Sequence, residues 1–329
     1  MSSETVLHAR SLTIDLFTKS GALRPVDGVS YSVGRGETLA IVGESSSGKT
    51  VMSFAPFGLM PMGVEVGLSG SLIFEGAELV GASRGTLRGL AGRKVGVIFQ
   101  DPMSALNPAR RIGRQIAESA EMHLGLTTQQ AEARALDMMK LVGISDPAAR
   151  MRQYPHELSG GLCQRAVIAA AVISEPSLLI ADEPTTALDV TIQAQILTVL
   201  KDIQTRLGMA MVLITHDIGV VAGCADRVAV MYAGRIAEQG GAEDVLLNPA
   251  HPYTRGLIAA IPRPDDAIGS HFRGLPGLPP VLEGPVEGCA FAPRCNRSLP
   301  PCRARRPSLW RDPAAPRVAF CHVLALEPA

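Results

Sequence analysis

The chain has 329 residues, of which 47% are hydrophobic, so it can bury a full α/β core and add a second, smaller unit. It carries 31 basic and 31 acidic residues, which gives a formal charge of zero. This balance argues against a general nucleic-acid binder, which would show a basic excess.

The sequence contains no stretch suited to spanning a membrane. The longest apolar run, around residues 166–181, is interrupted by Glu175 and Pro176 and is shorter than the roughly 20 residues that a spanning helix needs. The N-terminal residues include Glu4 and Asp15, which do not fit a signal peptide. We therefore expect a cytosolic protein that reaches the membrane only through membrane partners.

The pattern of apolar residues predicts an α/β fold. Antiparallel strands are expected over 6–17 and 26–33, followed by a buried strand over 37–43. Residues 101–175 are mostly helical in pattern, and strands then alternate with helices from residue 178 to residue 236. Such alternation indicates a parallel sheet.

The composition changes after residue 261, where Pro, Gly, Arg and Cys become frequent and periodicity is lost. We therefore predict a main domain over residues 1–260, with a helical subdomain at about 101–175. Residues 261–329 are predicted to form a C-terminal extension.

Residues 43–50 read GESSSGKT and fit the phosphate-loop pattern G-x-x-x-x-G-K-[ST], between an apolar strand and a predicted helix. Lys49 would place a cation at the β- and γ-phosphates, and the Thr50 hydroxyl suits Mg²⁺. A chance Gly/Ser turn is the alternative, which the flanking strand and helix disfavour. The backbone N–H groups that would cradle the phosphates belong to Gly43, Ser45, Ser46, Ser47 and Gly48.

Several polar residues follow apolar strands. Asp182 ends the run LLIAD and would hold Mg²⁺ through water, while Glu183 would act as general base on the attacking water. Gln100 and His216 also follow strands. Alone, Gln100 would be an ordinary loop residue and His216 an ordinary strand-end histidine, so their interpretation depends on the phosphate loop.

Residues 156–165 read HELSGGLCQR and contain a second N–H-rich anion site, formed by Ser159, Gly160 and Gly161 at the start of a helix. One chain does not need two phosphate cradles for one ATP. We therefore predict a head-to-tail dimer in which this element closes on the nucleotide of the partner.

With these motifs the chain resembles the ABC ATPases. The resemblance assigns residues 43–50 to Walker A, Gln100 to the Q-loop, residues 159–161 to the signature and residues 182–183 to Walker B. It also assigns Leu188 and Asp189 to the D-loop and His216 to the switch histidine. The family fold is a P-loop NTPase fold with a parallel-sheet core, an antiparallel β flank and a helical subdomain.

The same resemblance implies ATP and Mg²⁺ as cofactors. It assigns catalysis to Glu183, His216 and Gln100, and it places Thr50, Gln100 and Asp182 around Mg²⁺. Asp189 and the signature residues would contact the nucleotide.

Four longer segments resemble the oligopeptide/dipeptide/nickel importer branch, specifically the first of its two paired ATPases. They are FQDPMSALNP at 99–108, ADEPTTALDVTIQAQIL at 181–197, VMYAGRIAEQG at 230–240 and HPYTRGLIAAIP at 251–262. The resemblance implies a heterodimer with a second related ATPase on the cytoplasmic face of a bacterial membrane. Its other partners would be two permease subunits and, indirectly, an extracytoplasmic solute-binding protein.

This branch implies import of short peptides or related small solutes. A soluble ABC ATPase of DNA repair or translation is one alternative, although such proteins typically carry coiled coils, tandem cassettes or basic extensions. A redox-sensing iron–sulfur ATPase is the other.

Several positions depart from the family pattern, among them Leu162 and Cys163, which replace a more polar pair after the signature. Ser46 stands where these importers usually have Gly, and a positive φ there would cost about 1 kcal/mol. Phe17 is the candidate for stacking on adenine, although Leu16 occupies the place where we would expect the ring. The alternative for Phe17 is a strand residue that packs on the core.

Four of the six cysteines cluster near the C-terminus, and in a reducing compartment such clusters indicate metal ligands. We expect that the residues around them cannot bury enough apolar surface to order themselves, so a metal would supply the missing stability. Zinc, an iron–sulfur cluster and free thiols all remain open on the residues alone. The resemblance to the peptide-importer ATPases implies a [4Fe–4S] cluster on Cys289, Cys295, Cys302 and Cys321.

Overall fold

The structure is a computed structural model that describes residues 4–19, 21–186, 188–261, 274–280, 284 and 286–326. It contains two compact units. The first comprises Met1–Val6, Val33–Thr38 and Ala82–Ile214, and the second comprises Leu7–Ser32, Leu39–Gly81 and Thr215–Ala329. Residues 262–273 lie outside the described part, so the predicted boundary near residue 261 stays a prediction.

The first unit is built on three parallel strands in the order β8-β7-β6. Strands β7 and β8 are buried along their whole length, because layers on both faces cover them. The parallel sheet predicted from the alternating pattern is confirmed. The elements of this unit are α2 Arg84–Leu90, β6 Val95–Ile98, α3 Pro102–Ala105, α4 Ile112–Leu124, α5 Thr128–Leu141, α6 Pro147–Arg150, η2 Pro155–Glu157, α7 Gly160–Val172, β7 Leu178–Asp182, α8 Val190–Leu207 and β8 Ala210–Thr215.

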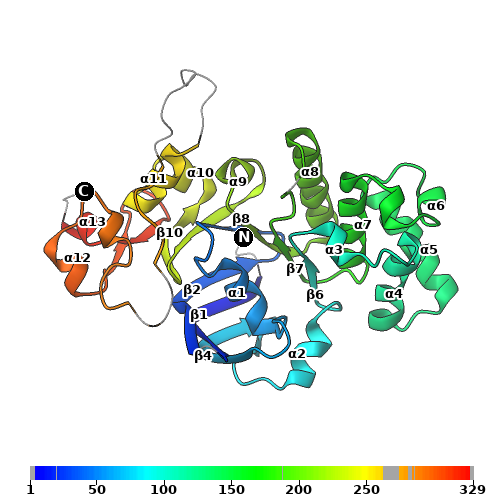
Figure 1. The fold of residues 1–329 in the computed structure, drawn as a ribbon, viewed down its shortest axis with the longest axis horizontal. Helices are drawn as coiled ribbons and strands as arrows, with labels where there is room; N and C mark the ends of the chain where they lie inside the picture. Colours follow the sequence, from blue (N-terminus) through cyan, green and yellow to red (C-terminus); the bar gives the residue numbers. More distant parts are fainter. Residues whose placement is uncertain are drawn as a thin grey trace. The chain divides into compact units, whose positions relative to one another are not determined.

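Residues 101–175 have the helical character that their pattern predicts (Figure 1). Helix α4 packs against α5 and α7, and it buries Ile112, Ile116 and Ala120 on one side. Thr127 and Gln130 form a capping box that fixes the start of α5. Among the described residues, no helix combines the length and the apolar character that crossing a membrane requires.

The second unit contains the antiparallel flank, a sheet in the order β2-β1-β4-β5. Strands β1 and β4 pair antiparallel from Leu7 opposite Phe74 to Phe17 opposite Glu65. The first two strands are longer than the sequence predicted, at 14 residues each. The remaining elements of this unit up to residue 261 are β1 Thr5–Thr18, β2 Gly21–Gly34, β3 Thr38–Val42, α1 Lys49–Phe54, η1 Ala55–Phe57, β4 Glu65–Phe74, β5 Ala77–Glu78, α9 Ile218–Cys224, β9 Arg227–Tyr232, β10 Arg235–Gly241, α10 Ala242–Leu247 and α11 Pro252–Ala259.

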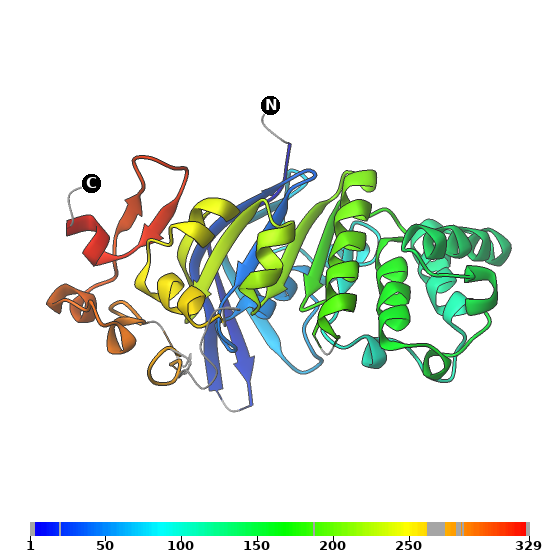
Figure 2. The same ribbon diagram turned by 90° about the horizontal axis from the view of Figure 1, so that it is seen from above.

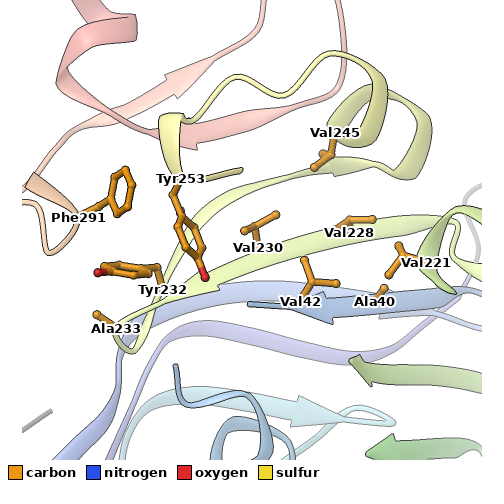
Figure 3. Close-up of a cluster of buried hydrophobic side chains, with 11 residues drawn as sticks. Ala40, Val42, Val221, Val228, Val230, Tyr232, Ala233, Val245, Tyr253 and Phe291 are labelled. Atoms are coloured by element: carbon orange, nitrogen blue, oxygen red, sulfur yellow. The ribbon is translucent and has the colours of Figure 1, made fainter. Parts of the chain in front are cut away.

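The second sheet of this unit runs β11-β12-β10-β9-β3. Strand β3 is parallel to β9, whereas β9 and β10 form an antiparallel hairpin. The apolar run at 227–236 could be a single strand by its pattern, but the chain turns at Ala233 and Gly234 and divides it between β9 and β10. The hairpin, β3 and the helices beside them enclose a buried apolar cluster (Figure 3).

The C-terminal segment is more ordered than its composition predicted. Strand β12 pairs with β10 and with β11, so the tail extends the sheet (Figure 2). Phe291, Ala319 and Val323 are buried, which corrects the expectation that this segment cannot bury enough apolar surface. Phe291 packs in the apolar cluster of the β9–β10 hairpin, whereas Ala319 and Val323 pack in a second cluster with Ala250. The sequence of the tail alone does not show these partners. The elements of the tail are η3 Ala292–Arg294, α12 Pro300–Ala304, β11 Leu309–Arg311, β12 Val318–Phe320 and α13 His322–Leu326.

Candidate nucleotide site

The phosphate loop lies in the second unit, between β3, which ends at Val42, and α1, which begins at Lys49. Two of its glycines are required by contact. A Cβ atom on Gly43 would lie 2.2 Å from the Met231 carbonyl oxygen, and one on Gly48 would lie 2.0 Å from the Pro25 carbonyl oxygen. The neighbouring strands β9 and β2 therefore lie so close to the loop that only glycine fits at these two positions.

Lys49 is buried at the base of the loop, where its Nζ atom donates to the carbonyl oxygens of Gly43 at 2.8 Å and Glu44 at 2.9 Å. Thr50 is exposed in the first turn of α1. Ser47 is buried, and its carbonyl accepts a hydrogen bond from the N–H of Gly234 at 3.0 Å. The loop is therefore anchored to the β9–β10 hairpin on one side.

Ser45 and Ser46 are exposed at the tip of the loop. Ser46 has a φ of 63°, in the left-handed region, where a residue with a side chain is strained and glycine is not. Because Ser46 stands where the family usually has Gly, its β-carbon adds backbone strain that glycine would not have.

Sequence reasoning missed the loop residue Glu44 and two residues that hold it, Tyr253 and Arg294. The N–H of Glu44 donates to the Tyr253 hydroxyl at 2.9 Å, and the Glu44 carboxylate pairs with the Arg294 guanidinium at 2.6 and 2.9 Å. Hydrogen bonds with Glu44 are the main cause that raises the pKa of Arg294. Tyr253 lies in a segment that the family resemblance singled out, whereas nothing local marked Arg294.

The two carboxylates predicted to take part in catalysis and Mg²⁺ binding lie in the first unit. Strand β7 ends at the buried Asp182, and Glu183 follows with a φ of 47°. The Glu183 Oε2 atom accepts hydrogen bonds from Gln100 Nε2 at 2.8 Å and from Thr186 Oγ1 at 2.9 Å. The structure therefore brings together Gln100 and Glu183, which the family resemblance assigns to two separate motifs, and holds one carboxylate oxygen in a defined orientation.

The signature element also lies in the first unit. Ser159 caps the N-terminus of α7, where its Oγ atom accepts from the N–H of Leu162 at 3.4 Å. Ser159 and Gly160 are exposed, and Gly161 is half-buried. The D-loop residue Asp189 caps α8 in the same way, accepting from the N–H of Ile192 at 2.9 Å. Two helix N-termini are thus formed where the sequence predicted nucleotide contacts.

Gln164 is a further residue that the sequence analysis missed. It is buried in α7, and its Nε2 atom donates to the Pro184 carbonyl at 2.7 Å. This bond ties the signature helix to the turn that carries Glu183. A polar residue in the apolar run of α7 was the available signal.

His216 follows β8 in an exposed position, directly before Asp217, which caps α9. Phe17 is 47% exposed near the end of β1, and Leu16 is buried. The core-packing alternative for Phe17 is therefore wrong, and its stacking on adenine stays a prediction. A Cβ atom on Gly67 would lie 3.1 Å from the Phe17 ring, so the ring lies over a glycine of β4.

The four clustered cysteines lie in the tail of the second unit. The N–H of Cys289 donates to the Cys302 carbonyl at 2.7 Å. Burial raises the pKa of Cys289 to about 11, with the charges of Cys302 and Cys321 acting in the same direction, and burial also raises the pKa of Cys295.

These thiols are thus close enough to interact, and their donor chemistry fits a four-thiolate site. Within the described part of the chain, however, no three potential ligands are arranged to hold a metal ion. The ring of His322, beside Cys321, instead contacts the Arg305 carbonyl at 3.0 Å.

Fold and site together define a P-loop ATPase with a separate signature element. Residues 26–186 match the family described as ABC transporter, and residues 237–302 match the oligopeptide/dipeptide transporter C-terminal region. The chain is 47% identical over 299 residues to the dipeptide transport ATP-binding protein DppD of Bacillus subtilis, covering 91% of this chain and 89% of that protein. It is 46% identical over 294 residues to OppD, the oligopeptide transport ATP-binding protein of the same organism, covering 89% and 82%.

Solved structures agree on the fold. The dimeric post-hydrolysis cassette MJ0796, bound to ADP and Pi, superposes with a TM-score of 0.62 at 22% identity, covering 72% of this chain and 98% of that chain. CbiO1 of Clostridium perfringens, part of the ABC transporter complex CbiONQ, gives 0.63 at 27% identity, covering 75% and 92%. The chain belongs to the ABC transporter ATP-binding proteins, in the oligopeptide/dipeptide branch, and is an ATPase.

Proposed function

We propose that this chain hydrolyses ATP to energise the import of short peptides, or of related small solutes, through an ABC transporter. The similarity to the DppD and OppD proteins along most of the chain supports the role in transport. The oriented Glu183 carboxylate and the constrained phosphate loop support the hydrolytic half.

Within this function, the phosphate loop binds the nucleotide. Its N–H groups and Lys49 meet the phosphates, with Lys49 leaving the loop carbonyls that it contacts in this structure. Thr50, Gln100 and Asp182 provide the oxygen donors that Mg²⁺ prefers, and the ion would neutralise charge on the transferring phosphoryl. Phe17 is the proposed stacking surface for adenine.

Glu183 is the proposed general base. Gln100 and Thr186 donate hydrogen bonds to its Oε2 atom and so orient the carboxylate that would accept the proton of the attacking water. His216 would stabilise charge on the phosphoryl group.

The signature residues are proposed to close on ATP held by a second, related ATPase, with Asp189 at the same interface. The exposed N-terminus of α7 supports this role, since it offers its N–H groups outward. Two permease subunits and, indirectly, an extracytoplasmic solute-binding protein complete the proposed assembly on the cytoplasmic face of the bacterial membrane.

We propose a [4Fe–4S] cluster as the ligand of the four tail cysteines, with zinc as the alternative. The clustering of four thiols in one small, partly buried segment supports it. Protein purified without air should be brown and contain iron and acid-labile sulfide, and Cys302→Ser should remove both without abolishing ATP binding. Stoichiometric zinc without iron in such protein would rule the cluster out.

Peptide uptake in cells provides the test of transport. A strain that lacks this chain should lose uptake of labelled di- and tripeptides, and wild-type protein should restore it. Lys49→Ala should be expressed at the same level without restoring uptake. Full uptake by the Lys49→Ala strain would contradict the proposed function.

A further inference from the structure

The phosphate loop contains an acidic residue that a phosphate site does not need. Glu44 is the second residue of the loop, and its own carbonyl lies 2.9 Å from the Lys49 Nζ atom. If this loop holds phosphates, a carboxylate on its second residue would lie within the roughly 10 Å over which charges interact at ordinary ionic strength. Without compensation, Glu44 would repel the nucleotide.

The compensating charge comes from the C-terminal tail. Arg294 contacts the Glu44 carboxylate with two nitrogens, Nη1 to Oε2 at 2.6 Å and Nη2 to Oε1 at 2.9 Å. The two residues are 250 positions apart in the chain. The Arg294 side chain is only 6% exposed and that of Glu44 is 25% exposed, so water screens the pair weakly.

The position of Arg294 is fixed independently of Glu44. Its Nε atom donates to the Pro276 carbonyl at 2.6 Å, and Nη1 also reaches the Tyr232 hydroxyl at 3.2 Å. The guanidinium carbon lies 5.7 Å from the centre of the Tyr232 ring and 6.0 Å from that of Phe291. These contacts place the cation before any nucleotide binds.

The same apolar cluster supports the loop through a second contact. Tyr253 packs 4.5 Å from Tyr232, ring centre to ring centre, and its hydroxyl accepts the N–H of Glu44 (Figure 3). The backbone of Glu44 is therefore bonded to Tyr253 of α11, and its side chain is bonded to Arg294 of η3. Both supports lie outside the motif that defines the loop.

We propose that Arg294 is a positioning residue for nucleotide binding: the tail neutralises Glu44 and fixes the start of the phosphate loop, so that ATP affinity depends on the C-terminal segment. This inference rests on the proposed nucleotide function of the loop. The electrostatic part of the inference makes a prediction that a packing role does not. Removing the negative charge of Glu44 should restore the nucleotide affinity that is lost when Arg294 is replaced.

The experiment measures the Kd of Mg²⁺–ADP for the purified full-length chain by calorimetry. Arg294→Ala should raise the Kd about tenfold, as expected for loss of one charged hydrogen-bonded pair. Arg294→Lys should lie between wild type and Arg294→Ala, because a single ammonium replaces the fork. Glu44→Gln alone should change the Kd less than Arg294→Ala does, because it leaves no uncompensated negative charge in the loop, and Arg294→Ala combined with Glu44→Gln should recover most of the lost affinity.

Arg306→Ala is the matched control, since Arg306 belongs to the same tail but pairs with Asp27 instead of the loop. It should leave the Kd unchanged. The Arg294→Ala defect should also shrink at high salt. If Arg294→Ala does not fold, Arg294→Lys, alone and combined with Glu44→Gln, decides the outcome through the two Kd values.

Two results would overturn the inference. One is a Kd for Arg294→Ala within twofold of wild type. The other is a double variant that binds no better than Arg294→Ala. Lys49→Ala separates this inference from the proposed function, because a Lys49→Ala protein with wild-type affinity would contradict the nucleotide site itself.

Discussion

The two glycine-containing anion sites of this chain are built in different ways. In the phosphate loop, Gly43 and Gly48 face backbone carbonyls that leave no room for a β-carbon. In the signature, a Cβ at Gly160 would lie an ordinary 3.6 Å from the Leu188 side chain, and one at Gly161 would lie 2.9 Å from the Ile192 side chain, so both face side chains instead of backbone. The first site is enclosed by strands of its own unit, whereas the second opens outward from a helix end.

This difference separates two tasks. An enclosed loop fixes its N–H groups before the ligand arrives, which favours tight binding by one chain. An exposed helix end binds little by itself and gains its function when another surface supplies the ligand. Substitutions in the loop should therefore change nucleotide binding by the isolated chain, whereas those in the signature and carboxylate unit should change hydrolysis alone.

Glu183→Gln should give the largest effect on the hydrolysis side. The change keeps the shape of the side chain and removes the base, so ATP turnover by the assembled transporter should fall by about 10²–10⁴-fold. ATP should still bind, and ATP-closed dimers should accumulate. Wild-type turnover by this variant would show that another group is the base.

Gly48→Ala should give the largest effect on the binding side. The new β-carbon would lie 2.0 Å from the Pro25 carbonyl at a φ of 99°, and strain of this kind costs about 3 kcal/mol or more. Calorimetry on the isolated chain should show loss of ADP binding by about 10²-fold, the equivalent of that energy. Gly160→Ala is the control and should bind ADP as wild type.

Ser159→Arg addresses the open site directly. The long cation should block approach to the partner's nucleotide, and misplacement of reacting groups typically costs about 10²-fold in rate. ATP binding to the loop of the same chain should be unchanged when measured on the isolated subunit. Complete loss of that binding would mean that the signature acts within its own chain, which contradicts the dimer.

The support behind the phosphate loop should respond to pH through His251. Burial lowers the pKa of His251 to about 4, against about 6.5 in the unfolded chain. Between these values the unfolded chain binds more protons, so the stabilisation present above pH 6.5 is lost as the pH falls, by up to about 3 kcal/mol.

His251→Asn keeps a side-chain acceptor for the N–H of Tyr253 and removes the titration. Denaturant unfolding at pH 7 and pH 5 should show a smaller loss of stability for this variant than for wild type. Burial raises the pKa of the nearby Glu238, which acts in the opposite direction, but Glu238 is common to both proteins. Equal losses in the two proteins would show that His251 is not the group responsible.

Ser46→Gly should give the smallest effect. Glycine removes the strain of a φ of 63°, worth about 1 kcal/mol, but it also loses more entropy on folding. We expect ADP affinity to rise by no more than about fivefold, in line with that energy. Weaker binding by Ser46→Gly would show that the serine side chain itself contributes to the site.

The sequence by itself determined the elements whose signals are local. The loop at 43–50, the strand ending at Asp182 and the helix starting after Ser159 each combine a short motif with a turn or cap chemistry that neighbouring residues fix. The parallel sheet followed because strands alternate with helices along the chain. Gln100 and Glu183 each follow one of two adjacent parallel strands, β6 and β7, whose carboxyl ends lie at the same edge of the sheet. The sequence did not predict the hydrogen bond between them.

Only the tertiary structure decided what surrounds the loop and how the tail is ordered. Met231, Pro25 and Arg294 come from distant parts of the sequence, and no local pattern states that they meet the loop. The tail looked unable to form a core because its apolar partners lie on β9 and β10. The burial of a side chain and the compensation of its charge depend on all the residues that lie around it in space. Local sequence patterns do not say which residues these are.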